Sequence, residues 1–273
     1  ISHQSIMNGA ELKEIKNINT LILESTYGST DSLKLGTWES ESIRFAKSIN
    51  KVLNEGGSVL IPVFALGKTQ EILSLIHDMM LKGKLIETDI YTGGISREIS
   101  NLYDKNRYVT RRRDKNFAIN DVPQINLLEI EDYNIFRKRP GIVLASSGMM
   151  LPGTTSYKLL DFWMRHNNFA IFIVGYMDAG APGYVVANSN KGDKIKLTEF
   201  SETREIKCNV ERFYFPSHSR REDLVKMVKK TNPGKVILIH GESNSKNWLG
   251  SKILEDLSHI KVYSASTGRT ILI

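Results

Sequence analysis

Short apolar runs alternate with segments of helical periodicity along most of this 273-residue chain. The run from Ser58 to Val63, for example, precedes a segment from Gly67 to Leu81 that places Ile72, Leu73 and Ile76 on one face. Two parallel strands need a crossover connection between them, which is usually a helix. The alternation therefore predicts an α/β fold with a mostly parallel, helix-covered sheet.

The same patterns place the expected elements. Strands are expected at residues 20–23, 58–63, 89–91, 141–145 and 169–174, with helices at 37–53, 67–81 and from the loop after Gly153 to about Trp163. After about residue 192 the sequence alternates as in strands with one solvated face, at 194–197 and 206–214. The last expected elements are a helix at 221–230, a strand at 235–239, a helix at 245–257 and strands near Val262 and Ile271.

Two of the predicted strands end in a polar side chain followed by small residues. Glu24 closes one strand before the sequence Ser-Thr-Tyr-Gly28, and His240 closes another before Gly241 and Glu242. In an open α/β sheet, ligands gather at the carboxyl ends of strands. A carboxylate and an imidazole at such ends, far apart in the chain, predict a site whose two walls flank an insertion.

The composition limits the classes of partner. Lysine and arginine number 37 against 30 acidic residues, a formal net charge of +7 that favours nucleic acid, although a soluble protein with spare lysines fits equally well. The clusters Arg111–Arg113 and Arg137–Arg139 are candidate phosphate contacts or solvated faces. The single cysteine, Cys208, excludes a disulfide framework and fits a reducing, cytoplasmic location. No apolar run approaches the length that spans a bilayer, so no membrane association is expected.

Each candidate site residue also has a plainer interpretation. His240 could bind zinc or another divalent metal, or it could be a core histidine satisfied by the backbone. His218, in the turn after Phe215, suits a general acid, a phosphate contact or a simple surface histidine. Glu24 could orient a histidine by accepting its N–H, or it could be a charge on a loop rim.

The segment Gly67-Lys68-Thr69 resembles the end of a phosphate-binding P-loop. It follows a predicted strand and opens a helix. The P-loop also needs a glycine five residues earlier, and that position is Pro62, which has no amide hydrogen. This feature argues against an unrelated nucleotide-binding α/β protein.

Several motif segments occur in a fixed order along the chain. They are Glu24-Ser-Thr-Tyr-Gly28, Ile61-Pro-Val-Phe-Ala-Leu-Gly67, Ala145-Ser-Ser-Gly-Met-Met150, Gly175-Tyr176, Ser217-His218 and His240-Gly-Glu242. Over nearly the whole chain this series resembles the β-CASP branch of the metallo-β-lactamase superfamily, the RNA-processing nucleases. The resemblance implies an α/β fold in which a parallel-sheet β-CASP domain, residues 31–205, is inserted in a partial metallo-β-lactamase αββα fold made of residues 1–30 and 206–273.

The resemblance also implies roles for individual residues. Glu24 matches the acidic residue that buttresses the catalytic histidine, His218 matches the histidine proposed to protonate the leaving oxygen, and His240 matches a ligand of one zinc ion. A histidine at this third position, with glutamate at the first, resembles the RNA-acting members. The expected contacts to the RNA backbone are Ser146, Ser147, Gly148, Gly153, Ser217 and Ser219, of which the first four fit a plain tight turn equally well.

The chain departs from the family pattern in two ways. Pro216 and Arg220 replace the family's serine and aspartate beside His218, which bears on the orientation of that histidine; Arg220 could instead add a phosphate-facing cation. The His-x-His-x-Asp-His signature is missing, and Ile1-Ser2 matches the pair that follows the family's bridging aspartate. The chain is therefore expected to be a fragment that begins just past the amino-terminal metal ligands.

The function implied for the full-length protein is that of a zinc-dependent ribonuclease, an endonuclease or a 5′ exonuclease, with two zinc ions and RNA as its partner. The segment alone is expected to bind little zinc tightly and to be inactive, because it supplies one expected ligand. The alternative is a catalytically inactive β-CASP scaffold that binds RNA or protein partners. The sequence does not fix the oligomeric state, although exposed edges of an incomplete host domain would favour a homodimer.

Overall fold

The computed structural model describes residues 6–9, 18–32 and 35–272, which form two compact units. The first unit holds Gly9–Gly36 and Pro216–Ile273, and the second holds Thr37–Phe215 together with residues 6–8. The domain boundaries expected from the sequence, at residues 30 and 205, stay a proposal. The Ile1-Ser2 match lies outside the described residues.

The second unit is built on a six-stranded sheet in the order β4-β3-β5-β2-β6-β9, in which all neighbours are parallel. The strands are β2 (Val59–Pro62), β3 (Asp89–Thr92), β4 (Ile125–Asn126), β5 (Gly141–Ala145), β6 (Ala170–Ile173) and β9 (Asn209–Arg212). The expectation of an α/β fold with a parallel sheet is therefore confirmed.

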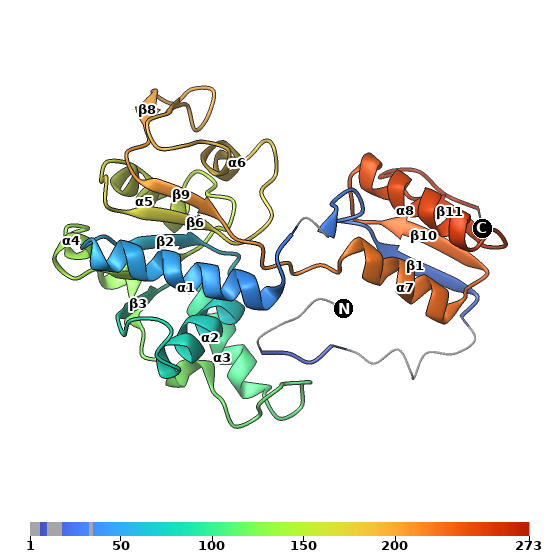
Figure 1. The fold of residues 1–273 in the computed structure, drawn as a ribbon, viewed down its shortest axis with the longest axis horizontal. Helices are drawn as coiled ribbons and strands as arrows, with labels where there is room; N and C mark the ends of the chain where they lie inside the picture. The colour runs from blue at the N-terminus through green and yellow to red at the C-terminus, as the bar shows by residue number, and fades with distance from the viewer. Residues whose placement is uncertain (1–5, 10–17, 33–34, 273) are drawn as a thin grey trace. The chain divides into compact units, whose positions relative to one another are not determined.

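Helices cover this sheet on both faces (Figure 1). They are α1 (Trp38–Asn54), α2 (Lys68–Leu81), α3 (Ile95–Lys105), α4 (Ile135–Lys138), α5 (Thr155–Met164) and α6 (Pro182–Ala187). The short strands β7 (Lys194–Ile195) and β8 (Arg204–Glu205) form a separate antiparallel pair, and two 3-10 turns, η3 (Ile119–Asp121) and η4 (Leu127–Glu129), complete the unit.

Successive residues of the central strands point into two different cores. In β2, Val59 and Ile61 belong to the cluster with Phe45 of α1, whereas Leu60 belongs to the cluster with Trp163 of α5. All five of these side chains are fully buried. A strand with both faces covered reads as a continuous apolar run, which explains why these strands were readable in the sequence.

The first unit contains a three-stranded parallel sheet in the order β1-β10-β11. Its elements are β1 (Thr20–Glu24), β10 (Lys235–Ile239), β11 (Lys261–Ser264), α7 (Arg221–Thr231) and α8 (Ser243–Asp256) (Figure 1). Leu23, Val236 and Leu238 pack with residues of both helices in one core. The alternate positions Ile22 and Ile239 are 62% and 37% exposed, so only one face of this sheet is covered by described residues.

Some sequence expectations after residue 192 were wrong. The segment 206–214 contains only β9, and β9 pairs in parallel with β6 at the sheet edge. The strand expected in this segment is therefore present but shorter than predicted, and it lies at an edge of the sheet. The strand expected at 194–197 is limited to β7, and the described residues near Ile271 form no strand. Helices α3 and α6 were not predicted.

In the part of the chain that the structure describes, no helix is both long and apolar enough to cross a bilayer.

Cys208 provides a test of the second core. It is fully buried in the cluster of Trp163 and Phe169, and burial raises the pKa of its thiol to about 12. Because the thiolate is the reactive form, we expect the native protein to resist alkylation at mildly alkaline pH and to react once unfolded in urea. Rapid stoichiometric labelling of the native protein would contradict this packing, and a Ser251→Cys variant, exposed on α8, is the fast-reacting control.

Glu41 on α1 gives a pH-dependent test. Burial alone would raise the pKa of its carboxyl, but hydrogen bonds from Arg44 and the Tyr214 backbone N–H outweigh that effect and hold the pKa below its usual value. A lowered folded-state pKa stabilises the protein above the unfolded-state pKa, and this contribution is lost as the pH falls through the folded-state pKa. We expect Glu41→Gln to lower the free energy of unfolding by about 1–2 kcal/mol at neutral pH.

Urea denaturation across pH checks this expectation. The difference between the wild-type protein and Glu41→Gln should shrink as the pH falls through the acid range, because the wild-type carboxylate then becomes protonated. Glu39→Gln, an exposed change in the first turn of the same helix, should have little effect at any pH. A difference for Glu41→Gln that stays constant with pH would assign its role to shape rather than to charge.

Candidate functional site

The pairing of β1 with β10 brings Glu24 and His240 together. The two strands are parallel over five residue pairs, from Thr20 opposite Lys235 to Glu24 opposite Ile239. His240 follows Ile239 directly, so both polar side chains stand at the carboxyl ends of adjacent strands. This is the edge at which parallel sheets place their ligands.

Small residues hold the backbone of this edge in place. Ser25 is fully buried, its hydroxyl donates to the carbonyl of Ile239 (2.7 Å), and its backbone N–H donates to the carbonyl of His240 (3.2 Å). A Cβ on Gly241 would lie 2.6 Å from the Ser25 hydroxyl, so only glycine fits there. His240 itself adopts a left-handed backbone conformation, φ 47°, which costs a non-glycine residue about 1–2 kcal/mol.

His218 reaches the same edge from the loop between β9 and α7. Its Nδ1 lies 3.5 Å from Oε2 of Glu24, and the backbone N–H of the next residue, Ser219, donates to Oε1 of Glu24 (3.1 Å). The carboxylate therefore faces both the ring and the backbone of this loop. The side chains of His218 and Glu24 are 35% and 26% exposed, which leaves the ring accessible to a substrate.

The two histidine rings are stacked, and Thr26 connects His240 to Glu24. The ring centroids of His218 and His240 are 5.0 Å apart with 27° between their planes, and the edge of Tyr27 faces the His218 ring at 6.1 Å. The Thr26 hydroxyl lies 2.9 Å from Nδ1 of His240, and the Thr26 backbone N–H donates to Oε2 of Glu24 (2.8 Å). These contacts leave Nε2 of His240 for another ligand.

The charge of Glu24 is stabilised by its neighbours. Burial alone would raise the pKa of this carboxyl, but the contact with His218 and the hydrogen bonds from Thr26 outweigh that effect and hold the pKa below its usual value. Glu24 is therefore an anion at neutral pH. A fixed carboxylate beside Nδ1 of His218 favours the tautomer that carries its proton there.

The donor set suits zinc in kind but is only part of a site. Glu24, His218 and His240 can each offer one atom, all within 4.8 Å of one another, and they form the one such group among the described residues. Imidazole nitrogen and carboxylate oxygen are ordinary zinc ligands, but zinc takes four ligands in all. Both Glu24 oxygens already accept hydrogen bonds, whereas His240 is exposed, so His240 fits a metal best and Glu24 fits the role of an orienting group.

The convergence expected from the sequence is therefore present for Glu24, His218 and His240. Of the expected RNA contacts, Ser217 is exposed in the loop of His218, and Ser219 touches Glu24 through its backbone. Ser146, Ser147, Gly148 and Gly153 lie in the second unit, in the loop between β5 and α5. Their contact with RNA stays a prediction.

The structure gives that loop a packing role of its own. The carbonyls of Ser146 and Ser147 accept hydrogen bonds from Ser156 (2.9 and 2.7 Å), and a Cβ on Gly148 would lie 2.9 Å from the backbone nitrogen of Phe64. Gly153 has φ +85°, a conformation that favours glycine. The turn thus requires glycine at positions 148 and 153, whatever they bind, whereas Ser146 and Ser147 take part through backbone carbonyls that any residue has.

Sequence reasoning assigned no role to Thr26, although it touches both Glu24 and His240. A signal was available, because a residue two positions after a strand-end carboxylate can donate its backbone N–H to it. Arg220 was considered a candidate phosphate-facing cation, but its guanidinium donates to the carbonyl of Gly36 (3.0 Å). The backbone contact explains an arginine there without invoking a phosphate.

Two family models match the chain. Residues 69–185 match the Beta-Casp domain, and residues 203–265 match the Zn-dependent metallo-hydrolase RNA specificity domain. The second match includes His218 and His240, and Glu24 lies outside both. Together the two matches cover well over half of the chain.

Similar proteins come from archaea and animals. The RNase aCSPSF2 of Saccharolobus solfataricus is 28% identical over 99% of this chain and 52% of its own length, and an RNase J-like protein of Methanocaldococcus jannaschii is 30% identical over 84% and 53%. Integrator complex subunit 11 of Gallus gallus is 26% identical over 93% of this chain and 41% of its own length. A crystal structure of a protein of unknown function from Enterococcus faecalis V583 matches with a TM-score of 0.47 and 11% identity, covering 94% of this chain and 52% of that one.

The chain spans about half the length of the first two of these relatives. The order of its motif segments, the parallel sheet of its second unit and the two family models agree. The chain belongs to the β-CASP family of the metallo-β-lactamase fold.

Proposed function

We propose that this chain contributes to a zinc-dependent ribonuclease that hydrolyses RNA phosphodiester bonds. The observation that carries the proposal is the convergence of Glu24, His218 and His240 at one sheet edge. Two relatives are named as RNases, and the model that matches residues 203–265 is named for RNA specificity and zinc dependence. The proposal covers endonucleolytic and 5′ exonucleolytic cleavage alike.

His218 acts in this proposal as the general acid. Its Nδ1 faces Glu24, so Nε2 is the atom that gives a proton to the leaving ribose oxygen. Glu24 stays ionised at neutral pH, so its carboxylate can accept the Nδ1–H of the neighbouring ring and orient it. The 3.5 Å contact is long for a hydrogen bond, but such contacts commonly shorten when substrate binds.

His240 holds a zinc ion through Nε2, since its Nδ1 is taken by Thr26. When bound, zinc supplies Lewis-acid chemistry that activates water and steadies negative charge on the scissile phosphate. Further ligands must come from outside the residues that the structure describes. Ser217 and Ser219, which flank His218, are the proposed hydroxyl contacts to the RNA backbone.

Replacing His240 tests the metal assignment. In the intact protein, His240→Ala should lower RNA cleavage by at least about 100-fold, since loss of a direct ligand should cost no less than loss of an outer partner. Zinc content measured by mass spectrometry should fall with it. His259→Ala, which removes an exposed histidine of the same unit, should change neither quantity. Unchanged turnover in His240→Ala would end this assignment.

Replacing His218 and Glu24 tests the proton transfer. His218→Ala should lower kcat by about 10²–10⁴-fold because it removes the general acid. Glu24→Gln keeps the size of the side chain but removes its charge and should lower kcat by about 10–100-fold. Both variants should retain their zinc, and Glu255→Gln, an exposed change on α8, is the control. Loss of zinc in either variant would make that residue a ligand instead.

The alternative is a β-CASP scaffold that binds RNA or a protein without cleaving it. The same measurements separate the two functions. An intact wild-type protein that binds RNA but fails to cleave it when supplied with zinc would establish the scaffold.

A further inference from the structure

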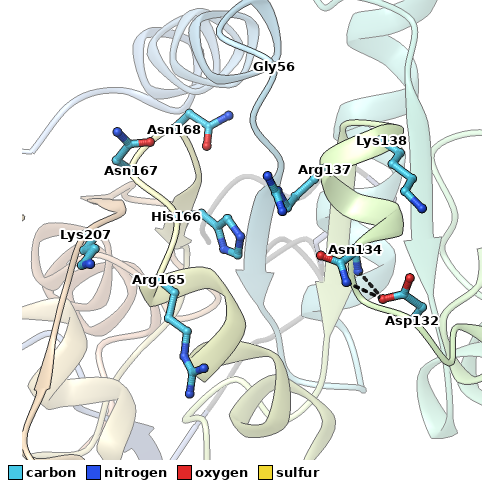
Figure 2. Close-up of a pocket in the computed structure, with 10 residues that line it drawn as sticks. All are labelled: Gly56, Asp132, Asn134, Arg137, Lys138, Arg165, His166, Asn167, Asn168 and Lys207. Carbon is cyan, nitrogen blue, oxygen red and sulfur yellow. Dashed lines mark hydrogen bonds between the residues drawn. The ribbon is translucent and has the colours of Figure 1, made fainter.

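A pocket of about 730 Å³ lies in the second unit, at the edge where strands of its sheet begin (Figure 2). Gly56 precedes β2, Lys138 precedes β5, Asn168 precedes β6 and Lys207 precedes β9. Because these strands are parallel, their amino ends meet at one edge of the sheet. The loop Ser146–Gly153 follows the carboxyl end of β5 and so belongs to the opposite edge. The pocket is therefore separate from the expected RNA contacts of this unit.

The lining of this pocket is strongly cationic. Arg137, Lys138, Arg165 and Lys207 line it, against a single carboxylate, Asp132. Arg165 is already paired with Asp161, a residue outside the lining, at 2.5 Å. Among the residues that the structure describes, Arg137 and Lys207 form no ion pair, and Lys138 is near enough to Asp132 for their charges to interact. Uncompensated cations gathered around one hollow attract an anion.

Asp132 can offset at most one of these cations, Lys138, with which its charge interacts. Its Oδ1 accepts hydrogen bonds from both the backbone N–H and the side-chain amide of Asn134, at 2.9 and 2.8 Å. Those contacts tie the carboxylate to its own loop. The positive charge of the lining is therefore available to a ligand.

An aromatic ring stands at the centre of the pocket. His166 Nδ1 lies 2.7 Å from the carbonyl of Phe162, which can only accept, so Nδ1 donates. The ring packs against Phe162 and Phe169, with centroids 4.4 and 4.8 Å away. In Figure 2, Arg137 extends toward His166 while Lys207 lies on its other side. The ring is thus fixed in place between cations that come from two different segments.

The rest of the lining is also held in place. The side-chain amide of Asn168 donates to the carbonyl of Glu55 (3.3 Å), and the ammonium group of Lys191 donates to the carbonyl of Asn167 (2.8 Å). The backbone N–H of Lys207 donates to the carbonyl of Met164 (2.8 Å). A floor that is already held in place loses little conformational entropy when a ligand binds.

We propose that this pocket binds the phosphodiester backbone of single-stranded RNA. The cavity is much larger than one phosphate ion, and its free cations lie on two sides of it, so it suits a chain with successive charges. Cations that flank an aromatic ring are typical of single-strand binding, in which a base stacks while its phosphates are neutralised. An acidic peptide would use the cations but not the ring. The inference rests on the proposed function in taking RNA as the polyanion.

Salt-dependent RNA binding tests the pocket. The probe is a fluorescent single-stranded oligouridylate of about 20 nucleotides, bound by the intact protein with a chelator present and followed by anisotropy at several salt concentrations. Arg137→Ala combined with Lys207→Ala should weaken binding by about 10-fold near 0.1 M salt. The slope of log affinity against log salt should lose about 1.4 in magnitude, which corresponds to two phosphate contacts on a single strand.

Two matched double variants control for charge and folding. Lys47→Ala with Lys84→Ala removes the same charge from exposed positions of the same unit outside the pocket and should leave the slope close to the wild-type value. Arg137→Lys with Lys207→Arg keeps the charge and should retain most of the affinity. If the pocket and control variants lose equal RNA affinity, the effect arises from net charge alone and the proposal is wrong.

Competition identifies the ligand. An unlabelled single-stranded RNA should displace the probe from the wild-type protein, whereas uridine monophosphate should not, because it offers a single phosphate. Displacement by the mononucleotide at similar concentration would make this a nucleotide site. If the pocket variant binds RNA normally but loses binding to polyglutamate, the occupant is an acidic peptide and the proposal is wrong. Because cleavage is blocked by the chelator, neither result depends on the catalytic assignment.

Discussion

The parallel pairing of β1 with β10 is the interaction on which the candidate site depends. Its register places Glu24 opposite Ile239, and His240 follows at once, so residues more than two hundred positions apart become neighbours. A slip of one residue in this pairing would turn Glu24 to the other face of the sheet. The core formed by Leu23, Val236 and Leu238 with α7 and α8 opposes such a slip, because burial of these alternate side chains fixes which face is inward.

The site edge is held by backbone contacts more than by its functional side chains. Ser25 joins the ends of the two strands through its hydrogen bond to Ile239. Position 241 accepts only glycine, because any larger side chain there would clash with Ser25. The left-handed backbone of His240 is a strained conformation that the surrounding contacts must maintain, which is common at functional sites. Glu24 then receives donors from Thr26, Ser219 and His218, and a carboxylate with several donors stays charged and well oriented.

The second unit differs from the first in how its sheet is covered. Helices cover its parallel sheet on both faces, so polar chemistry is confined to the two edges where strands begin and end. The carboxyl edge carries the glycine-containing turn Ser146–Gly153, and the amino edge carries the cationic pocket around His166. If both edges contact RNA as proposed, a single strand would be held by this unit at two places, and the amino-edge contacts would add affinity without taking part in chemistry.

Periodicity and motif order in the sequence determined the α/β class, most central strands and the three residues that converge, because buried strands read as apolar runs and their ends are marked by polar residues. The contact of Thr26 with His240, that of Ser219 with Glu24 and the packing of Gly148 against Phe64 needed the tertiary structure. Each joins segments whose separation in the chain carries no distance information. The same holds for the pairing of β9 with β6 at the sheet edge and for the cationic pocket. The residues that line this pocket come from segments that each precede a different strand. They meet only because parallel strands begin at the same edge of the sheet.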